Sequence, residues 1–231
     1  MSSDLFSFRR PLILAPHPDD EALGCAGTII KLNSAGAVSQ VAYITSGELL
    51  HGEPSTATAA ERVGEAENAS RMLGCVPPRF LGIPDGQVAT NLDRVVDSIL
   101  TIIEETGPDL VLSPSPLDHH TDHIATASAA IRIHREHGVF SLAFYEIYST
   151  VRFSHLVDIT DVVKQKKEAI SSYRTSLYEK PDIYARAILG LNAQRSLFLQ
   201  TAGYYEAFWV LREPLTEGEI LHWLTYGFSR G

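Results

Sequence analysis

The sequence predicts an α/β fold in which a mostly parallel sheet is covered by helices on both faces. Short apolar runs with the length of buried strands alternate with longer stretches of helical character. Glycine-containing stops separate them, including Gly36, Gly74 and the Gly107-Pro108 pair. Strands that alternate with helices in this way form parallel sheets with helices on both faces.

Five apolar runs are the expected strands of the first part of the chain. The first, "PLILAP", is of buried-strand type, and "VSQVAYIT" is the second. The third, "RFLGI", is followed by the turn signal "PDG", and "DLVLSPSP" is a strand that runs into a loop. With the strand-like "VFSLAFYEIYS", the expected ranges are 11–16, 38–45, 79–83, 109–116 and 139–149.

Four helices are expected between these strands. The first closes on Gly36, the second on Gly74, and the third is capped by Asn91. The fourth, "TDHIATASAAIRIHREHG", turns a face of small residues inward. The expected ranges are 20–35, 58–73, 92–106 and 121–138.

After about residue 150 the alternation loosens. We expect a final helix capped by Thr216, and before it two strands and two helices. The expected strands lie at 155–160 and 204–211, and the helices at 161–179, 183–203 and 216–228. We therefore predict a single domain over 1–231, with a doubly wound core in 1–150 and an appended α/β layer in 151–231.

Composition narrows the class of protein. The chain has 231 residues and a formal charge of −9, which disfavours nucleic acid as a partner because phosphate binding depends on Lys and Arg clusters. The apolar stretch near the N-terminus, "PLILA", is too short to span a membrane. The two cysteines, Cys25 and Cys75, suggest a reducing compartment, so a cytoplasmic location is expected.

Two polar clusters follow the ends of two predicted strands. His17, Asp19, Asp20 and Glu21 come directly after the first strand, and "DHHTDH" at 118–123 comes after the fourth. In doubly wound sheets, ligands bind at the carboxyl ends of the strands, near the point where the strand order reverses. We therefore expect the two clusters to face each other across one crevice.

Helix capping is the alternative explanation of both clusters. Acidic residues are favoured in the first turn of a helix, and Thr121 or Asp122 could cap the helix that begins there. Capping does not explain His17, nor the presence of His120 and His123 beside a carboxylate that can orient one of them. Because the fold brings both clusters together, a metal site is the favoured interpretation.

His17, Asp20 and His123 form a set of two histidines and one carboxylate. Catalytic zinc usually has three protein ligands and an open fourth position for water. Ferrous iron accepts the same ligands, but the alternation of strands and helices favours hydrolytic zinc. A zinc-bound water needs a base, for which Asp19 and Glu21 are both candidates that spacing does not separate.

The two motifs "APHPDDEALGCAGTI" and "HTDH" together resemble those of the PIG-L / LmbE-like zinc deacetylases. Further agreement is spread over most of the chain, at 44–48, 61–74, 81–86, 157–160 and 206–208. The resemblance implies a Rossmann-like, zinc-dependent deacetylase that removes acetyl from an N-acetylated amino sugar of the N-acetylglucosamine type. It also implies a small-molecule substrate and a homo-oligomer, trimer or hexamer.

By resemblance, each residue of the motifs has a role. Zinc is held by His17, Asp20 and His123, with iron as an alternative metal, and Asp19 is the general base. His120, oriented by Asp122, stabilises the oxyanion. Two other positions match residues that contact substrate in relatives, Arg62 and Asp85.

The chain departs from the family pattern at Asp118, where some sugar-thiol deacetylases carry a tyrosine. The hypotheses that compete with deacetylation are a metal-dependent hydrolase of another bond, such as a phosphoester, and a metal- or sugar-binding module without turnover. A two-metal phosphoesterase usually needs more ligands than this crevice supplies.

Overall fold

A single mixed sheet organises the structure, a computed structural model that describes residues 7–50 and 52–226. Its strand order is β3-β2-β1-β4-β5-β7-β6. The strands are β1 (Pro11–Ala15), β2 (Gln40–Tyr43), β3 (Arg79–Phe80), β4 (Leu110–Pro114), β5 (Ser141–Tyr145), β6 (His155–Asp158) and β7 (Tyr205–Leu211).

The first five strands are parallel, and the last two run antiparallel to their neighbours. In β1, Ile13 is in register with Val41 of β2 on one side and Leu112 of β4 on the other. The strand order reverses between β1 and β4, so the ligand-binding switch point lies where the sequence places its two polar clusters. This confirms the predicted α/β class with a mostly parallel sheet.

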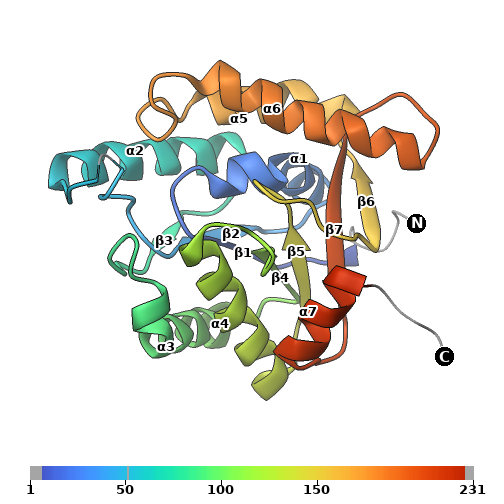
Figure 1. Ribbon diagram of the computed structural model, residues 1–231. Helices are drawn as coiled ribbons and strands as arrows, with labels where there is room; N and C mark the ends of the chain where they lie inside the picture. The colour runs from blue at the N-terminus through green and yellow to red at the C-terminus, as the bar shows by residue number, and fades with distance from the viewer. Residues whose placement is uncertain (1–6, 51, 227–231) are drawn as a thin grey trace.

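Helices cover both faces of the sheet (Figure 1). On one face lie α1 (Asp20–Ser34), α2 (Thr56–Met72), α5 (Val163–Ser171) and α6 (Pro181–Gln194), and on the other α3 (Leu92–Thr106), α4 (Thr121–His137) and α7 (Glu217–Tyr226). Each face has its own apolar core. The residues after 150 therefore extend the sheet by two strands and add helices to both of its faces.

Several predicted boundaries are wrong. The helix expected over 161–179 ends at Ser171, and the chain then turns, with left-handed φ values of 51° at Tyr178 and 57° at Glu179. The helix expected over 183–203 spans Pro181–Gln194 and is followed by a 3₁₀ turn. Strands β2 and β5 are shorter than the expected 38–45 and 139–149.

The final helix carries the predicted cap. The Thr216 hydroxyl accepts a hydrogen bond from the Glu219 N–H at 3.2 Å, and the Glu219 carboxylate accepts one from the Thr216 N–H at 2.8 Å. This reciprocal pair is a capping box. Residues 227 and 228, where the helix was expected to end, lie outside the described residues.

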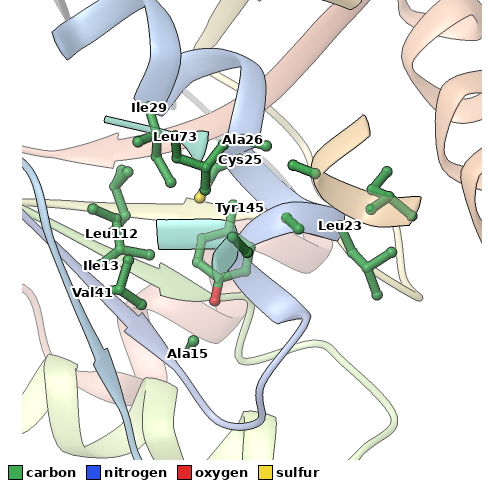
Figure 2. Close-up of a cluster of buried hydrophobic side chains, with 14 of the residues drawn as sticks. Ile13, Ala15, Leu23, Cys25, Ala26, Ile29, Val41, Leu73, Leu112 and Tyr145 are labelled. Atoms are coloured by element: carbon green, nitrogen blue, oxygen red, sulfur yellow. The ribbon is translucent and has the colours of Figure 1, made fainter. Parts of the chain in front are cut away.

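Close packing sets the position of α1 on the sheet. Figure 2 shows Ala26 and Ile29 of α1 on the side of the helix that faces buried side chains of the strands, such as Ile13 and Leu112. The ring of Tyr145 occupies the space beside Gly24, where a Cβ atom would lie 2.4 Å from a ring carbon. The Tyr145 hydroxyl donates to the Leu14 carbonyl at 2.7 Å. The absence of a side chain at Gly24 therefore lets α1 approach the strands closely.

A buried ion pair supports a break inside α1. The helix is non-helical at Cys25, where φ is −141°. The Glu206 carboxylate accepts hydrogen bonds from the N–H groups of Gly27 and Thr28, and the Lys166 ammonium donates to Glu206 at 2.7 Å. Both charged side chains are fully buried. They satisfy backbone groups that the break would leave without partners.

Among the described helices, none combines the length and apolarity that crossing a membrane requires.

Candidate metal centre and active site

The two polar clusters meet in one cavity of about 500 Å³ beyond the ends of β1 and β4. Its volume lies within the range of small-molecule sites, about 300–1,000 Å³. The cavity is lined from the first cluster by His17, Asp19 and Asp20, and from the second by His119, His120, Thr121 and His123. The predicted meeting of the clusters at the switch point is therefore present in the structure.

The Asp20 carboxylate lies between the two histidines expected to bind metal. Its Oδ2 atom is 3.4 Å from Nδ1 of His17 and 3.3 Å from Nε2 of His123. Two atoms that each bind a zinc ion at about 2.0–2.1 Å and a tetrahedral angle are about 3.4 Å apart. The two distances from Asp20 are therefore those expected of atoms that share one metal ion.

The other nitrogen of each histidine faces a carboxylate. Nε2 of His17 is 3.1 Å from Asp85 and 3.3 Å from Asp122, and Nδ1 of His123 is 3.4 Å from Asp118. Metal-binding histidines commonly donate their second N–H to such a partner, which fixes the tautomer and leaves the first nitrogen free for the metal. The partners of His17 direct its Nδ1 lone pair towards the ligand position.

The surrounding carboxylates create a site that favours positive charge. Burial lowers the pKa of His17, but Asp122, Asp20 and Asp85 outweigh it and raise the pKa well above the ordinary value. Burial also acts to lower the pKa of His123, and the charge of Asp20 is the largest opposing effect, so that the pKa rises to about 9. Burial acts to raise the pKa of Asp20 itself, but His123 and His17 lower it far below its usual range.

Two sets of three side chains among the described residues bring potential ligand atoms within 4.8 Å of one another. One comprises His17, His120 and His123, and the other His17, Asp85 and Asp122. The first contains both expected histidines, with His120 in place of Asp20. The second contains the two carboxylates that face Nε2 of His17. Assignment of Asp20 as the third ligand rests on its contacts with both histidines.

The structure separates the two acids that spacing left open as base. Asp19 lines the cavity, has an unfavourable φ of 136°, and makes no side-chain capping hydrogen bond. Burial raises its pKa well above the usual value, although Arg62, 3.5 Å away, acts in the opposite direction. Glu21 is fully buried, and its carboxylate accepts a 2.5 Å hydrogen bond from Tyr173. Burial raises the pKa of Glu21 to about 7, but Glu21 is not among the cavity-lining residues.

His120 occupies the N-cap position of α4, where Thr121 or Asp122 was expected. Its Nδ1 atom accepts a hydrogen bond from the main-chain N–H of Asp122 at 3.2 Å. The expected orientation of His120 by Asp122 therefore comes from the main chain, because the carboxylate accepts hydrogen bonds from Gly86 and Val88 instead. With Nδ1 an acceptor, a neutral His120 ring carries its proton on Nε2.

Arg62 and Asp85 both line the cavity, as the resemblance implies for residues near substrate. Asp85 contacts His17, as described above. Arg62 is only 3% exposed, and its side chain donates hydrogen bonds to the Ser176 hydroxyl and to the carbonyls of Gly47 and Pro18. Gly47 allows this approach, because a Cβ there would lie 2.0 Å from an Arg62 nitrogen. Contact of Arg62 and Asp85 with substrate stays a prediction.

A family model described as PIG-L, GlcNAc-PI de-N-acetylase, matches residues 12–134, more than half of the chain. The chain belongs to the PIG-L family. It is 27% identical over 191 residues to a diacetylchitobiose deacetylase of Thermococcus kodakarensis, a match that covers 74% of this chain and 71% of that protein.

Two further similarities agree with membership in the PIG-L family. A probable N-acetyl-alpha-D-glucosaminyl L-malate deacetylase of Bacillus cereus is 32% identical over 133 residues, which cover 54% of this chain and 60% of that protein. The solved structure of the conserved protein TT1542 from Thermus thermophilus is 28% identical, with a TM-score of 0.74 over 89% of this chain and 96% of that one.

The sequence analysis assigned no role to several side chains in or beside this PIG-L cavity. Asp118 lies 3.4 Å from Nδ1 of His123 and accepts a hydrogen bond from the His120 main-chain N–H at 3.0 Å. Its place in "DHHTDH" was a usable signal. The tyrosines that line the cavity, Tyr148, Tyr178 and Tyr184, come from separate segments without a shared motif, so no spacing could have identified them.

Proposed function

We propose that this chain is a metal-dependent N-deacetylase that hydrolyses the acetamide of an N-acetylglucosamine-type conjugate. The observation that carries the proposal is the position of Asp20 between His17 and His123, with Asp19 beside it in the same cavity. Membership in the PIG-L family and similarity to deacetylases of amino-sugar conjugates support the same reaction.

The ligands that we propose for the metal are His17, Asp20 and His123. Two imidazoles and one carboxylate suit zinc, and the same donors accept ferrous iron. A bound zinc ion would polarise the acetyl carbonyl and lower the pKa of a water molecule at its open position. The carboxylates beside His17 and His123 face the ring nitrogens that would not bind the metal, as partners of metal-binding histidines commonly do.

We assign Asp19 as the general base. Its carboxylate lines the cavity next to the ligand Asp20 and can accept the proton of the attacking water. Arg62 holds this part of the chain by donating to the Pro18 carbonyl at 2.9 Å. The strained backbone of Asp19 is therefore fixed from both sides, by the start of α1 and by Arg62.

We assign His120 as the group that stabilises the oxyanion. Because Nδ1 accepts from the Asp122 main chain, the neutral ring presents its Nε2 proton as a donor. One donor of this kind typically contributes about 3–4 kcal/mol to the transition state. Return of a proton to the leaving amine falls to Asp19 or to His120, both of which line the cavity.

Acetate release from a panel of N-acetylglucosamine conjugates tests the proposal, with chelator and with zinc added back. We expect release that the chelator abolishes and zinc restores. Asp19→Asn should keep the metal but lower kcat by about 10²–10⁴-fold. Retention of most of the kcat by Asp19→Asn refutes the base assignment, and the absence of acetate from every conjugate refutes deacetylation. A second metal per chain would instead favour phosphoester hydrolysis.

A further inference from the structure

A group of apolar and aromatic residues lines the part of the cavity that the proposed reaction does not use. We call it the tyrosine wall, and it consists of Tyr148, Tyr178, Tyr184, Leu49 and Leu50. The wall begins at the metal site, because the Tyr148 ring stacks on the ring of His123 with centroids 5.8 Å apart. Tyr184 lines the same cavity as Tyr148 and Tyr178.

Two tyrosines of the wall are partly exposed to solvent at the cavity. Tyr148 is 44% exposed and Tyr178 is 49% exposed, although both line a cavity. A pyranose ring presents C–H groups on its faces and hydroxyl groups around its edge. The face of a tyrosine ring can pack against the C–H groups of the sugar, and the tyrosine hydroxyl can form hydrogen bonds with the sugar hydroxyl groups.

The position of Tyr178 is fixed before any ligand binds. Tyr178 and Glu179 both have left-handed backbone conformations, which are unfavourable for residues with a side chain. The loop is held by two hydrogen bonds from Arg174 to Glu179, at 2.9 and 2.6 Å, and by one from the Tyr178 hydroxyl to the Leu50 carbonyl at 3.1 Å. A preformed aromatic surface loses little conformational freedom on binding.

The described lining of the cavity has no lysine, and its one arginine is already engaged by the protein. Among the described lining residues, Arg62 is the only Lys or Arg, and the protein's own acceptors occupy its Nε, Nη1 and Nη2. The lining also contains Asp19, Asp20 and Asp85. A carboxylate or phosphate on the leaving group would therefore find no unengaged guanidinium or ammonium group along this lining, as a charge-assisted hydrogen bond from lysine or arginine requires.

We propose that the tyrosine wall binds a second, uncharged pyranose ring, so that the preferred substrates are neutral N-acetylated oligosaccharides. This specificity rests on the proposed deacetylase function. Conjugates in which the amino sugar carries a carboxylate or phosphate are disfavoured. Arg62, for which the resemblance implies contact with substrate, donates hydrogen bonds that hold Gly47 and Pro18 beside the site.

Titration calorimetry on the Asp19→Asn protein tests the proposal without turnover. The ligands are N-acetylglucosamine, N,N′-diacetylchitobiose and N-acetylglucosaminyl malate. We expect the neutral disaccharide to bind about tenfold more tightly than the monosaccharide, and the malate conjugate no more tightly than the monosaccharide. Tighter binding of the malate conjugate than of the disaccharide overturns the proposal.

Variants of the wall add a second criterion. Tyr178→Ala should remove most of the gain from the second ring while affinity for the monosaccharide is kept, and Tyr178→Phe should retain the gain. The matched control is Phe198→Ala, because Phe198 is 60% exposed and lines a different cavity. An unchanged disaccharide affinity in Tyr178→Ala overturns the assignment.

Acetate release separates the two proposals. If the wild-type protein releases acetate fastest from the disaccharide, both stand. If no ligand releases acetate but the binding order and the effect of Tyr178→Ala are as expected, the deacetylase function fails and the tyrosine wall remains a sugar site. If acetate is released fastest from the malate conjugate, the function stands and the neutral specificity fails.

Discussion

The buried ion pair between Lys166 and Glu206 gives a prediction whose size follows from the structure. Glu206 accepts hydrogen bonds from the N–H groups of Gly27 and Thr28, from the Thr28 hydroxyl and from Lys166. Glu206→Gln removes the negative charge and places an NH₂ group where two of these donors need an acceptor. The Lys166 ammonium then stays buried without a carboxylate partner, and only neutral acceptors such as the Leu23 carbonyl remain to it.

Removal of one partner of a buried ion pair typically costs about 3–5 kcal/mol. For a chain of about this length, each kcal/mol lowers Tm by about 2–4 °C. We therefore expect Glu206→Gln to lower Tm by about 6–20 °C in a calorimetric scan. The structural consequence would centre on the break in α1 at Cys25.

An exposed ion pair at α1, the helix that the buried pair supports, provides the control. Lys31 of α1 contacts Asp161 at 2.9 Å, and the Asp161 side chain is 66% exposed. Asp161→Asn should cost no more than about 1 kcal/mol, because exposed pairs contribute little. The double variant Lys166→Met/Glu206→Gln should recover part of the loss, since no unpaired ammonium remains. Equal Tm changes for Glu206→Gln and Asp161→Asn would refute the reasoning.

Three other substitutions test individual contacts. Asp118→Asn should weaken zinc binding by about 10–100-fold in a competition titration with a chromogenic chelator, because it removes the carboxylate that faces an expected histidine ligand; unchanged affinity contradicts that role. Gly24→Ala should destabilise the fold by about 1–3 kcal/mol in urea unfolding, because the new Cβ would lie 2.4 Å from the Tyr145 ring, and a stability equal to wild type contradicts the packing. Gly47→Ala should displace the Arg62 side chain and lower acetate release while metal content is kept, whereas full activity would show that this approach is dispensable.

The sequence was most informative where a rule of topology applied. His17 and His123 are more than a hundred residues apart, yet the ends of neighbouring parallel strands must lie together, so their meeting could be predicted. The family resemblance then assigned roles that spacing alone left open. Spacing could not decide whether Asp19 or Glu21 is the base. Residues at the start of a helix point in different directions, and only the packing of α1 determines which of the two faces the cavity.

The parts that the sequence did not predict depend on contacts between distant segments. No glycine or proline marks the end of α5, and the turn at Tyr178 and Glu179 is held by Arg174 and by the Leu50 carbonyl. The break in α1 likewise depends on Glu206, far along the chain. Local propensity carries no information on such contacts. For this reason the helix over 161–179 was predicted too long, and the tyrosine wall was not predicted at all.

Metal content per chain tests the central claim most directly. Purified wild-type protein, loaded with zinc and dialysed, should contain one metal ion per chain by mass spectrometry. Asp19→Asn should retain it, whereas His123→Ala and Asp20→Ala should lose it although they remain folded by circular dichroism. Zinc retained at full stoichiometry in a folded Asp20→Ala or His123→Ala protein would contradict the proposed ligand set.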